Sequence, residues 1–335
     1  MLTRLVVAAV SFVLAAPTLA EAQQDKSKII LGYSKCAHCF PMALTPGLTD
    51  KLTIEPIGFN TASDVLTALV SKSVDVAQVT YLHFITALDK GFDVVAISGQ
   101  INGGSEILVQ PKLALAAGDW PSFRKLVLDR KAQRNPLRVA ASRGSAQDIH
   151  MRGELMINGI DVGKDIEFIN IPNPADHAAA LQRGEVDVIC TVEPFASQIK
   201  LAGIGGAFAQ PYGQAAGKLT NLIVTRSDVI DRRPRDVQET VNAVVKLVDK
   251  LNGNAQIWAD VIVKHTGLDM TTARAALKNA YPDYRIYRGS AFAIARMMSD
   301  LKYVSRDVST DNIDRHIDYR FLAEAVKKPK GDLGF

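Results

Sequence analysis

The sequence contains no apolar run long enough to span a membrane, and its charges nearly balance. The N-terminal apolar run covers residues 5–16, whereas a membrane helix needs about 20 residues, and no later segment qualifies. The formal net charge is only +4. Basic residues gather between Arg124 and Arg138, but Asp129 interrupts them and that stretch has no aromatic residues for base stacking. We therefore expect neither a membrane-spanning chain nor a nucleic-acid-binding one.

The N-terminus has the pattern of a secretory signal peptide. Arg4 precedes the apolar run, and small residues follow it up to Ala20-Glu21-Ala22. No cysteine follows directly, which argues against a lipid anchor. We expect residues 1–22 to be a signal peptide and the mature chain to be soluble and exported to the periplasm; a buried N-terminal helix is the alternative. The length of 335 residues suggests two domains.

Cysteine is scarce, with Cys36, Cys39 and Cys190 as its three occurrences. In an oxidising compartment the first pair is expected to form a local disulfide. Two alternatives remain open for this Cys-Ala-His-Cys loop: a metal site completed by His38 and His83, and a redox dithiol of thioredoxin type. Cys190 alternates with two valines along a predicted strand, which indicates a buried core thiol.

Two stretches of the chain, residues 54–80 and 166–195, resemble each other at a constant offset. Both contain Val-Asp-Val, at 74–76 and at 186–188. Each reads as strand, turn, helix and strand, and we expect this βαβ crossover to place its second strand parallel to and beside the first. The repeat predicts an α/β fold with two similar lobes and a cleft that closes on a small molecule.

The turn after the second lobe's first strand is a candidate anion site. Residues 137–141 are typical of a strand, Ser142-Arg143-Gly144-Ser145 of a tight turn, and residues 146–158 of a helix. A helix N-terminus presents unpaired N–H groups and partial positive charge, so an anion is favoured at Ser145 and Ala146. Arg143 would strengthen that field. The alternative is that Ser145 merely caps its own helix.

The C-terminal third has the apolar period of helices. The expected helices cover residues 237–251, 257–264, 271–280, 290–304 and 311–326. No catalytic cluster occurs among them. We expect these helices to pack on the first lobe and brace the hinge.

A resemblance to a known family rests on several of these segments. Arg-Val-Ala-Ala-Ser-Arg-Gly-Ser-Ala-Gln at 138–147, Ile-Pro-Asn-Pro at 171–174, Gly-Glu-Val-Asp-Val at 184–188 and Glu193-Pro194-Phe195 follow in order. The sequence resembles the solute-binding proteins of ABC importers for sulfonates, taurine, nitrate, bicarbonate and thiamine-precursor pyrimidines. The resemblance covers essentially the whole mature chain.

The resemblance implies a two-lobed periplasmic binding protein fold of class II type, with hinge strands between the lobes. We place the two crossings near Ile107–Gln110 and Leu222–Thr225. Lobe one would comprise residues 23–108 and 223–335, and lobe two residues 109–222. A monomer is expected, with no cofactor and no metal.

The resemblance also implies ligand-binding residues at the strand ends of both lobes. Lobe one would contribute the loop after the first strand, the turn before the first helix, the end of the Val-Asp-Val strand and the 99–104 loop: Ser34, Cys36, His38, Asn60, Thr61, Thr80, Tyr81 and Gly103. Lobe two would contribute Ser142, Arg143, Ser145, Ala146, Asn173 and Glu193. Glu193 could accept a hydrogen bond from a ligand ammonium or amino group; the alternative is a surface turn residue before Pro194.

The implied function is capture of a small anionic or zwitterionic organic solute, similar to a sulfonate, taurine or nitrate, and its delivery to an inner-membrane ABC permease. Two departures leave the ligand open. Thr191-Val192 stand where sulfonate and taurine binders often have a large aromatic residue, and the Cys-Ala-His-Cys loop is unusual for anion binders.

An enzyme is the competing class. Cys36, His38 and Cys39 supply the residue types of a thiolate pair or a metal site. In this the loop resembles that of the pyrimidine synthases that share this fold; a pyrimidine-precursor binding protein is a further alternative. Adjacent residues on one loop do not align a base with a thiol, however, so we expect no enzymatic activity. A periplasmic sensor domain is a third alternative.

Overall fold

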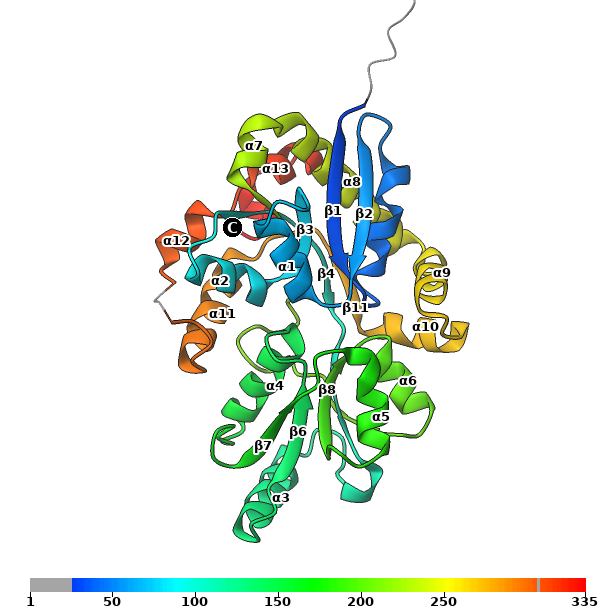
Figure 1. Cartoon of the computed structure of the whole chain (residues 1–335), viewed down its shortest axis with the longest axis vertical. Helices are drawn as coiled ribbons and strands as arrows, with labels where there is room; N and C mark the ends of the chain where they lie inside the picture. Colours follow the sequence, from blue (N-terminus) through cyan, green and yellow to red (C-terminus); the bar gives the residue numbers. More distant parts are fainter. Residues whose placement is uncertain (1–25, 306–307) are drawn as a thin grey trace, which may run out of the picture.

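Two α/β lobes stacked along the long axis make up the protein (Figure 1). The computed structural model describes residues 26–305 and 308–335, so the predicted signal peptide, residues 1–22, lies outside the described residues. Lobe one contains a six-stranded sheet of order β11-β4-β10-β3-β1-β2, and lobe two a five-stranded sheet of order β7-β6-β8-β5-β9. The predicted two-lobed α/β fold is confirmed.

The chain builds the lobes in three passes. The first pass, in lobe one, contains β1 (Lys28–Ser34), η1 (Phe40–Leu48), β2 (Thr53–Phe59), α1 (Ala62–Val70), β3 (Val76–Thr80), α2 (Tyr81–Asp89) and β4 (Val94–Gly103). The second, in lobe two, contains β5 (Ser105–Val109), η2 (Pro111–Leu113), α3 (Trp120–Ala132), β6 (Leu137–Ala141), α4 (Ala146–Ile157), β7 (Ile166–Asn170), η3 (Pro174–Asp176), α5 (His177–Gln182), β8 (Val188–Val192), α6 (Phe195–Leu201) and β9 (Gly206–Ala209). The third returns to lobe one with β10 (Asn221–Arg226), α7 (Ser227–Arg232), α8 (Pro234–Gly253), α9 (Ala255–Thr266), α10 (Met270–Ala276), η4 (Leu277–Asn279), β11 (Ala280–Asp283), α11 (Arg288–Asp300), α12 (Thr310–Arg315), α13 (Arg320–Val326) and η5 (Lys330–Leu333).

The sequence repeat is a structural repeat, but its strand order differs from the expected one. In lobe one β1 lies between β2 and β3, and in lobe two β6 lies between β7 and β8. The two strands of each repeated unit are therefore parallel to a shared central strand and not adjacent to each other. The expectation that they would lie side by side was wrong, because the strand that precedes each unit takes the position between them.

The aspartates of the two Val-Asp-Val segments perform the same structural task. Asp75 accepts the backbone N–H of Ile30 at 2.9 Å, and Asp187 accepts that of Arg138 at 3.0 Å. Both carboxylates thus fasten the turn before β3 or β8 to the central strand beside it. Their recurrence in the sequence follows from packing, not from ligand chemistry.

The chain crosses between the sheets at two places. The first crossing is at Gly103–Gly104, between β4 and β5, and the second covers residues 210–220, between β9 and β10. Both glycines have positive φ values, +90° and +87°, which residues with side chains rarely adopt. The residues expected to form the crossings, 107–110 and 222–225, instead lie in or directly after β5 and within β10.

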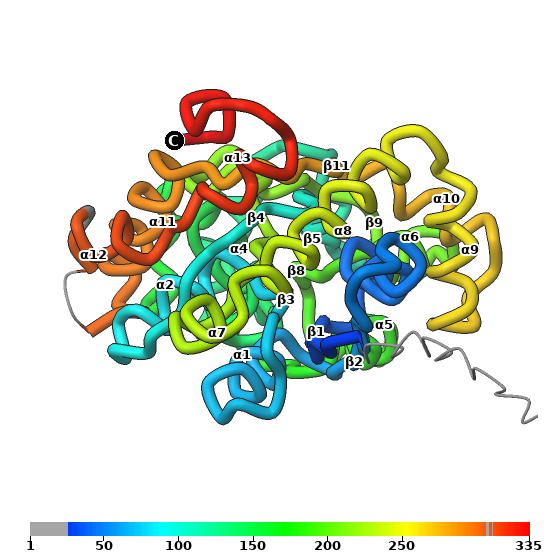
Figure 2. Tube along the Cα trace, turned by 90° about the horizontal axis from the view of Figure 1, so that it is seen from above, coloured from blue at the N-terminus to red at the C-terminus, as the bar shows by residue number. Residues whose placement is uncertain are grey.

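The C-terminal helices surround the six-stranded sheet (Figure 2). Helices α8, α9, α11, α12 and α13 pack on elements of lobe one, as expected, whereas α10 also contacts α6 of lobe two. The long helix α8 buries its apolar stripe, which includes Val237, Val241, Val244 and Val248. Among the described residues, the search for a helix long and apolar enough to cross a membrane gave no candidate.

Candidate functional site

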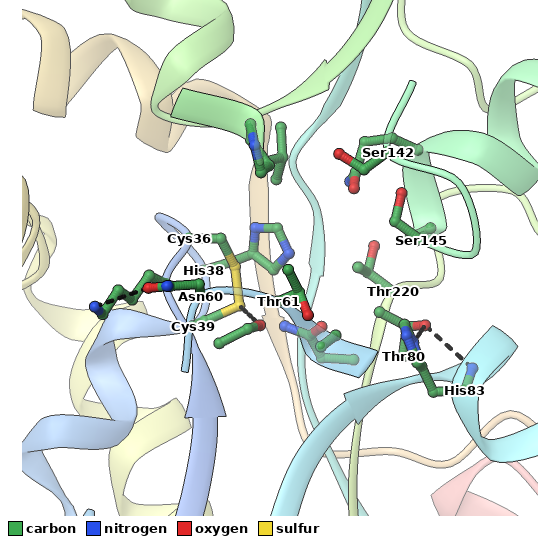
Figure 3. Close-up of a pocket in the computed structure, with 18 of the residues that line it drawn as sticks. Cys36, His38, Cys39, Asn60, Thr61, Thr80, His83, Ser142, Ser145 and Thr220 are labelled. Carbon is green, nitrogen blue, oxygen red and sulfur yellow. Dashed lines mark hydrogen bonds between the residues drawn. A yellow bond between two sulfur atoms is a disulfide. The ribbon is translucent and has the colours of Figure 1, made fainter. Parts of the chain in front are cut away.

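A cavity of about 60 Å³ lies between the lobes, where the strand ends of both sheets meet. Lobe one and the segment leading into β10 contribute Ser34, Lys35, Cys36, His38, Cys39, Asn60, Thr61, Ala62, Thr80, His83, Thr220 and Asn221. Lobe two contributes Ser142, Ser145, Ala146, Gln147, Pro172, Pro174 and Val192. Figure 3 shows Ser142 and Ser145 across the cavity from the disulfide loop, Thr61 and Thr80.

Three helices begin at the wall of this cavity. Each has a hydroxyl residue as its N-cap: Thr61 for α1, Thr80 for α2 and Ser145 for α4. The Ser145 hydroxyl accepts the Asp148 N–H at 3.3 Å, so Ser145 caps its own helix, as the alternative interpretation of this turn had it. The three N-termini come from both lobes and carry partial positive charge, which favours an anion between them.

The wall of the cavity, as far as the described residues form it, includes no aspartate or glutamate. Lys35 lies at the surface, where its Nζ donates to Asn60 Oδ1 at 3.0 Å. Burial lowers the pKa of His38 to about 3 and that of His83 to about 4, so both rings are neutral at pH 7. His83 is held by the Thr80 and Ser63 hydroxyls. The described wall therefore combines neutral polar groups and helix N-termini with Lys35, and it lacks negative charge.

The Cys-Ala-His-Cys loop forms the expected local disulfide between Cys36 and Cys39. Trp258 of α9 donates its ring N–H to the Ala37 carbonyl at 2.7 Å, which anchors the loop to lobe one. The Ala37 N–H donates to the Glu193 carbonyl at 2.9 Å and so joins the loop to lobe two.

The disulfide bears on the alternatives for this loop. The possible ligand atoms of Cys36, His38 and Cys39 lie within 4.8 Å of one another. A sulfur in a disulfide is not a thiolate, however, and thiolate is the form that binds metals and attacks substrates. The oxidised loop is thus suited to neither role. Cys190 is fully buried, as expected.

Most of the residues expected at the ligand site line this one cavity. They are Ser34, Cys36, His38, Asn60, Thr61 and Thr80 from lobe one, with Ser142, Ser145 and Ala146 from lobe two. Ser34 and Ser142 hold matching places, each directly at the carboxyl end of the central strand, β1 or β6. The pseudo-symmetry of the two lobes thus brings the repeated strand ends to one place.

Five expected residues do not line the cavity, and Glu193 is the main one. It is neither a ligand residue at the wall nor a surface turn residue: it is 1% exposed, and its carboxylate accepts the N–H and the hydroxyl of Ser197, both at 2.9 Å. Burial raises the pKa of Glu193 to about 7, and the Ser197 hydrogen bonds and Lys200 only partly offset this. The carboxylate fastens the first turn of α6.

The other four also have structural positions. Arg143 has an exposed side chain, and its backbone N–H donates to Asn170. Tyr81 is buried, with its hydroxyl accepting the Tyr287 N–H. Asn173 caps η3 by accepting the Ala175 N–H. Gly103 ends β4, so the expected 99–104 loop is mostly strand.

Several residues at the wall were not predicted. Thr220 ends the second crossing and Asn221 begins β10, where the sequence has no motif. Gln147 was within a recognised segment but was not singled out; it donates to the Ser105 hydroxyl at 3.0 Å. Val192 was named only because it stands where related binders often have an aromatic residue. Strand β10 pairs antiparallel with β3 in lobe one, just as β5 pairs antiparallel with β8 in lobe two. This equivalence of β10 and β5 can be recognised only from the sheets.

Comparisons with known proteins show the family and the fold. The model of the NMT1-like family matches residues 22–263. The nitrate/nitrite binding protein NrtA of Synechococcus elongatus is 27% identical over 146 residues, which is 42% of this chain and only 30% of that protein.

Solved structures share the fold at low identity. The periplasmic nitrate-binding protein NrtA of Synechocystis PCC 6803 matches with a TM-score of 0.76 and 16% identity over 92% of this chain and 91% of that one. The periplasmic aliphatic sulphonate binding protein SsuA of Escherichia coli matches with a TM-score of 0.70 and 18% identity, covering 87% and 92%. The chain therefore belongs to the NMT1-like family and has the fold of the solute-binding proteins of ABC importers.

Proposed function

We propose that this chain is the substrate-binding protein of an ABC importer, which captures a small anion between its lobes and delivers it to an inner-membrane permease. In this proposal residues 1–22 direct export to the periplasm, and the mature chain acts as a monomer without a cofactor. Family membership and fold support the transport role.

The convergence of three helix N-termini on one cavity carries the proposal. Helices α1 and α2 approach from lobe one and α4 from lobe two. An anion is stabilised by all three only when both lobes surround it, because helix-dipole effects fall off within the first turn. Binding therefore favours the closed arrangement of the lobes, which is the form that a permease would recognise.

The wall also bears on the kind of ligand. A single water needs about 10–15 Å³ of such space, so a cavity of about 60 Å³ accommodates a ligand of a few non-hydrogen atoms in this conformation. Nitrate and the head group of a sulfonate are of this order. Since the described wall provides no carboxylate, a zwitterion such as taurine would leave its ammonium group without a counter-charge.

Binding is favoured over catalysis by the same residues. The two sulfurs closest to the cavity are bonded to each other, and both ring nitrogens of His83 have hydroxyl partners. An enzyme would need an activated nucleophile or an effective base directed at the ligand. His38, at the same wall, has a pKa lowered to about 3 by burial and is therefore a weak base at pH 7.

A thermal-shift panel on the chain from residue 23 onward tests the proposal. The panel contains nitrate, nitrite, bicarbonate, alkyl and aryl sulfonates, taurine, aromatic carboxylates and formylated aminopyrimidines. A ligand at 100 times its dissociation constant adds about 2.7 kcal/mol to the free energy of unfolding, so a selective shift with one of the anions is the expected result. Zinc, copper and iron salts are tested in parallel. A shift with one of these metals and with none of the panel's ligands would overturn the proposal in favour of a metal or thiol site.

A further inference from the structure

Two buried polar atoms at the cavity wall have no hydrogen-bond partner. They are Nδ1 of His38 and Oδ1 of Asn221, in side chains only 2% and 1% exposed. Buried polar side-chain atoms are nearly always bonded, and leaving one unpaired is costly. Among the described residues the one other such atom is Oε1 of Gln110, which does not line the cavity.

The orientation of the Asn221 amide is fixed by its neighbours. The His38 carbonyl accepts a hydrogen bond from Nε2 of Gln100 at 3.0 Å, and a carbonyl can only accept. Oε1 of Gln100 therefore faces Asn221, whose Nδ2 donates to it at 3.1 Å. This relay assigns the remaining Asn221 atom as the oxygen, so the unpaired group is an acceptor that requires a donor.

His38 is the second group without a partner, and its ring is fixed in place. A Cβ atom on Gly104 would lie only 2.5 Å from its Nδ1, so the ring packs directly on that glycine. Being neutral, the ring offers one N–H and one lone pair. The cavity wall thus has an acceptor on Asn221 and, on His38, a nitrogen that donates in one tautomer and accepts in the other.

We infer that the natural ligand carries, beside its anionic group, an uncharged hydrogen-bond donor such as a hydroxyl or amide N–H, which Oδ1 of Asn221 accepts. This inference rests on the proposed function and narrows its substrate class. The donor is uncharged because the described wall has no carboxylate to balance an ammonium group. Asn221 thereby selects hydroxylated anions over nitrate, plain sulfonates and taurine.

The test compares ligands that differ by one donor. Isothermal titration calorimetry on the wild-type chain measures the dissociation constants of ethanesulfonate, 2-hydroxyethanesulfonate and taurine, and of acetate and glycolate. Two pairs differ by one hydroxyl: ethanesulfonate and 2-hydroxyethanesulfonate, and acetate and glycolate. In each pair the hydroxylated ligand is expected to bind at least about tenfold more tightly, because the other ligand leaves Oδ1 of Asn221 without a donor. Equal binding within both pairs would overturn the inference and leave the proposed function standing.

Two variants assign the preference to Asn221. Asn221→Leu removes the acceptor and is expected to reduce the preference to less than about twofold, chiefly by weakening the hydroxylated ligand. Asn242→Leu, on α8 and outside the cavity wall, should leave every affinity unchanged. A preference that survives Asn221→Leu overturns the assignment. Should Asn221→Leu fail to fold, the wild-type pairs decide, and failure of every anion to bind would remove the proposed function as well.

Discussion

Glu193 shows how a buried carboxyl group directly after a lobe-two strand can serve only the fold. Its position after β8 and before Pro194 suggested a ligand contact, yet both of its oxygens are used by Ser197. The sequence has no signal for this, because a serine four residues along a short helix is unremarkable. The direction of the side chain is decided by the backbone after β8, which the sequence leaves open.

The pKa of Glu193 predicts a pH dependence of stability. The folded chain keeps the proton up to pH about 7, whereas an ordinary glutamate loses it near 4.5. The stabilising effect of this proton is therefore complete below pH 4.5 and is lost as the pH rises to about 7. Urea unfolding should show the wild type losing up to about 3 kcal/mol relative to Glu193→Gln over that range. Parallel pH profiles would contradict the raised pKa.

Replacing Cys36 and Cys39 by serine should weaken both the fold and the ligand site. A disulfide closing so short a loop contributes about 2 kcal/mol to the free energy of unfolding. Affinity should fall as well, because both cysteines line the cavity and the loop bonds to Glu193 of lobe two. Urea unfolding and calorimetry measure the two effects. Thiol titration of the unfolded, unreduced wild type should find one free thiol, Cys190; an unchanged affinity in the variant would show that the loop takes no part in binding.

Substitutions at Ala146 and Arg143, on the same turn, test whether the anion binds inside the cavity. Ala146 is 3% exposed and lines the wall, so Ala146→Leu should fill the space and weaken anion binding by about tenfold or more. Arg143→Ala removes a side chain directed to solvent and should change affinity less than about twofold. Calorimetry decides between them. A larger effect at Arg143 would place the anion on the outer side of the turn.

At the scale of elements, local sequence patterns predicted the strands and helices better than they predicted the crossings between the lobes. The 3.6-residue period predicted α8, and the turn chemistry around Ser145 predicted the start of α4. The predicted positions of the two crossings differ from the observed ones, because short apolar strands occur on both sides of each crossing. Gly103-Gly104 was the better signal, since positive φ at two successive residues marks an abrupt change of direction.

Gly104 is predicted to tolerate substitution poorly. A side chain there meets both an unfavourable φ of +87° and the His38 ring, whereas Gly118 has a φ of +74° and open space around it. Gly118→Ala should thus cost about 1 kcal/mol, the backbone effect alone, and Gly104→Ala clearly more. Urea unfolding compares them. Equal losses would mean that His38 yields without cost, and in that case the ligand affinity of Gly104→Ala should also be normal.

At the scale of the whole molecule, contacts outside the cavity also join the lobes. Tyr303 follows α11 of lobe one, and its hydroxyl donates to Asp148 in the first turn of α4 of lobe two. The guanidinium of Arg152 lies over the Tyr303 ring, with its carbon 5.4 Å from the centroid. These contacts are well placed to stabilise the closed arrangement.

Tyr303→Phe should therefore lower ligand affinity without touching the cavity. A hydrogen bond to a charged group contributes about 1.5–3 kcal/mol, and 1.4 kcal/mol corresponds to tenfold in affinity. Tyr319→Phe is the control, because its hydroxyl donates to Ile286 within lobe one; it should cost stability and spare affinity. Calorimetry and the ligand-induced change in radius of gyration by X-ray scattering measure the result. Equal affinities for the two variants would exclude Tyr303 from closure.

The two-lobed architecture could be predicted from the sequence, because the same packing constraints, such as those met by Asp75 and Asp187, require the same residues in both lobes. Only part of the cavity wall could be predicted. Strand ends that carry motifs, such as Ser34 and Ser142, could be placed, whereas Asn221 enters from a strand with no motif and is brought to the wall by pairing across the sheet.

The two sheets also differ in how much of the chain must exist before each can form. Every strand of lobe two lies between Ser105 and Ala209, an uninterrupted segment. In lobe one, β10 sits between β3 and β4, so that sheet stays split until residues 221–226 have been made. The lobe whose strands emerge first is thus completed last, and during synthesis β3 and β4 lack the strand that separates them while all strands of lobe two are already present.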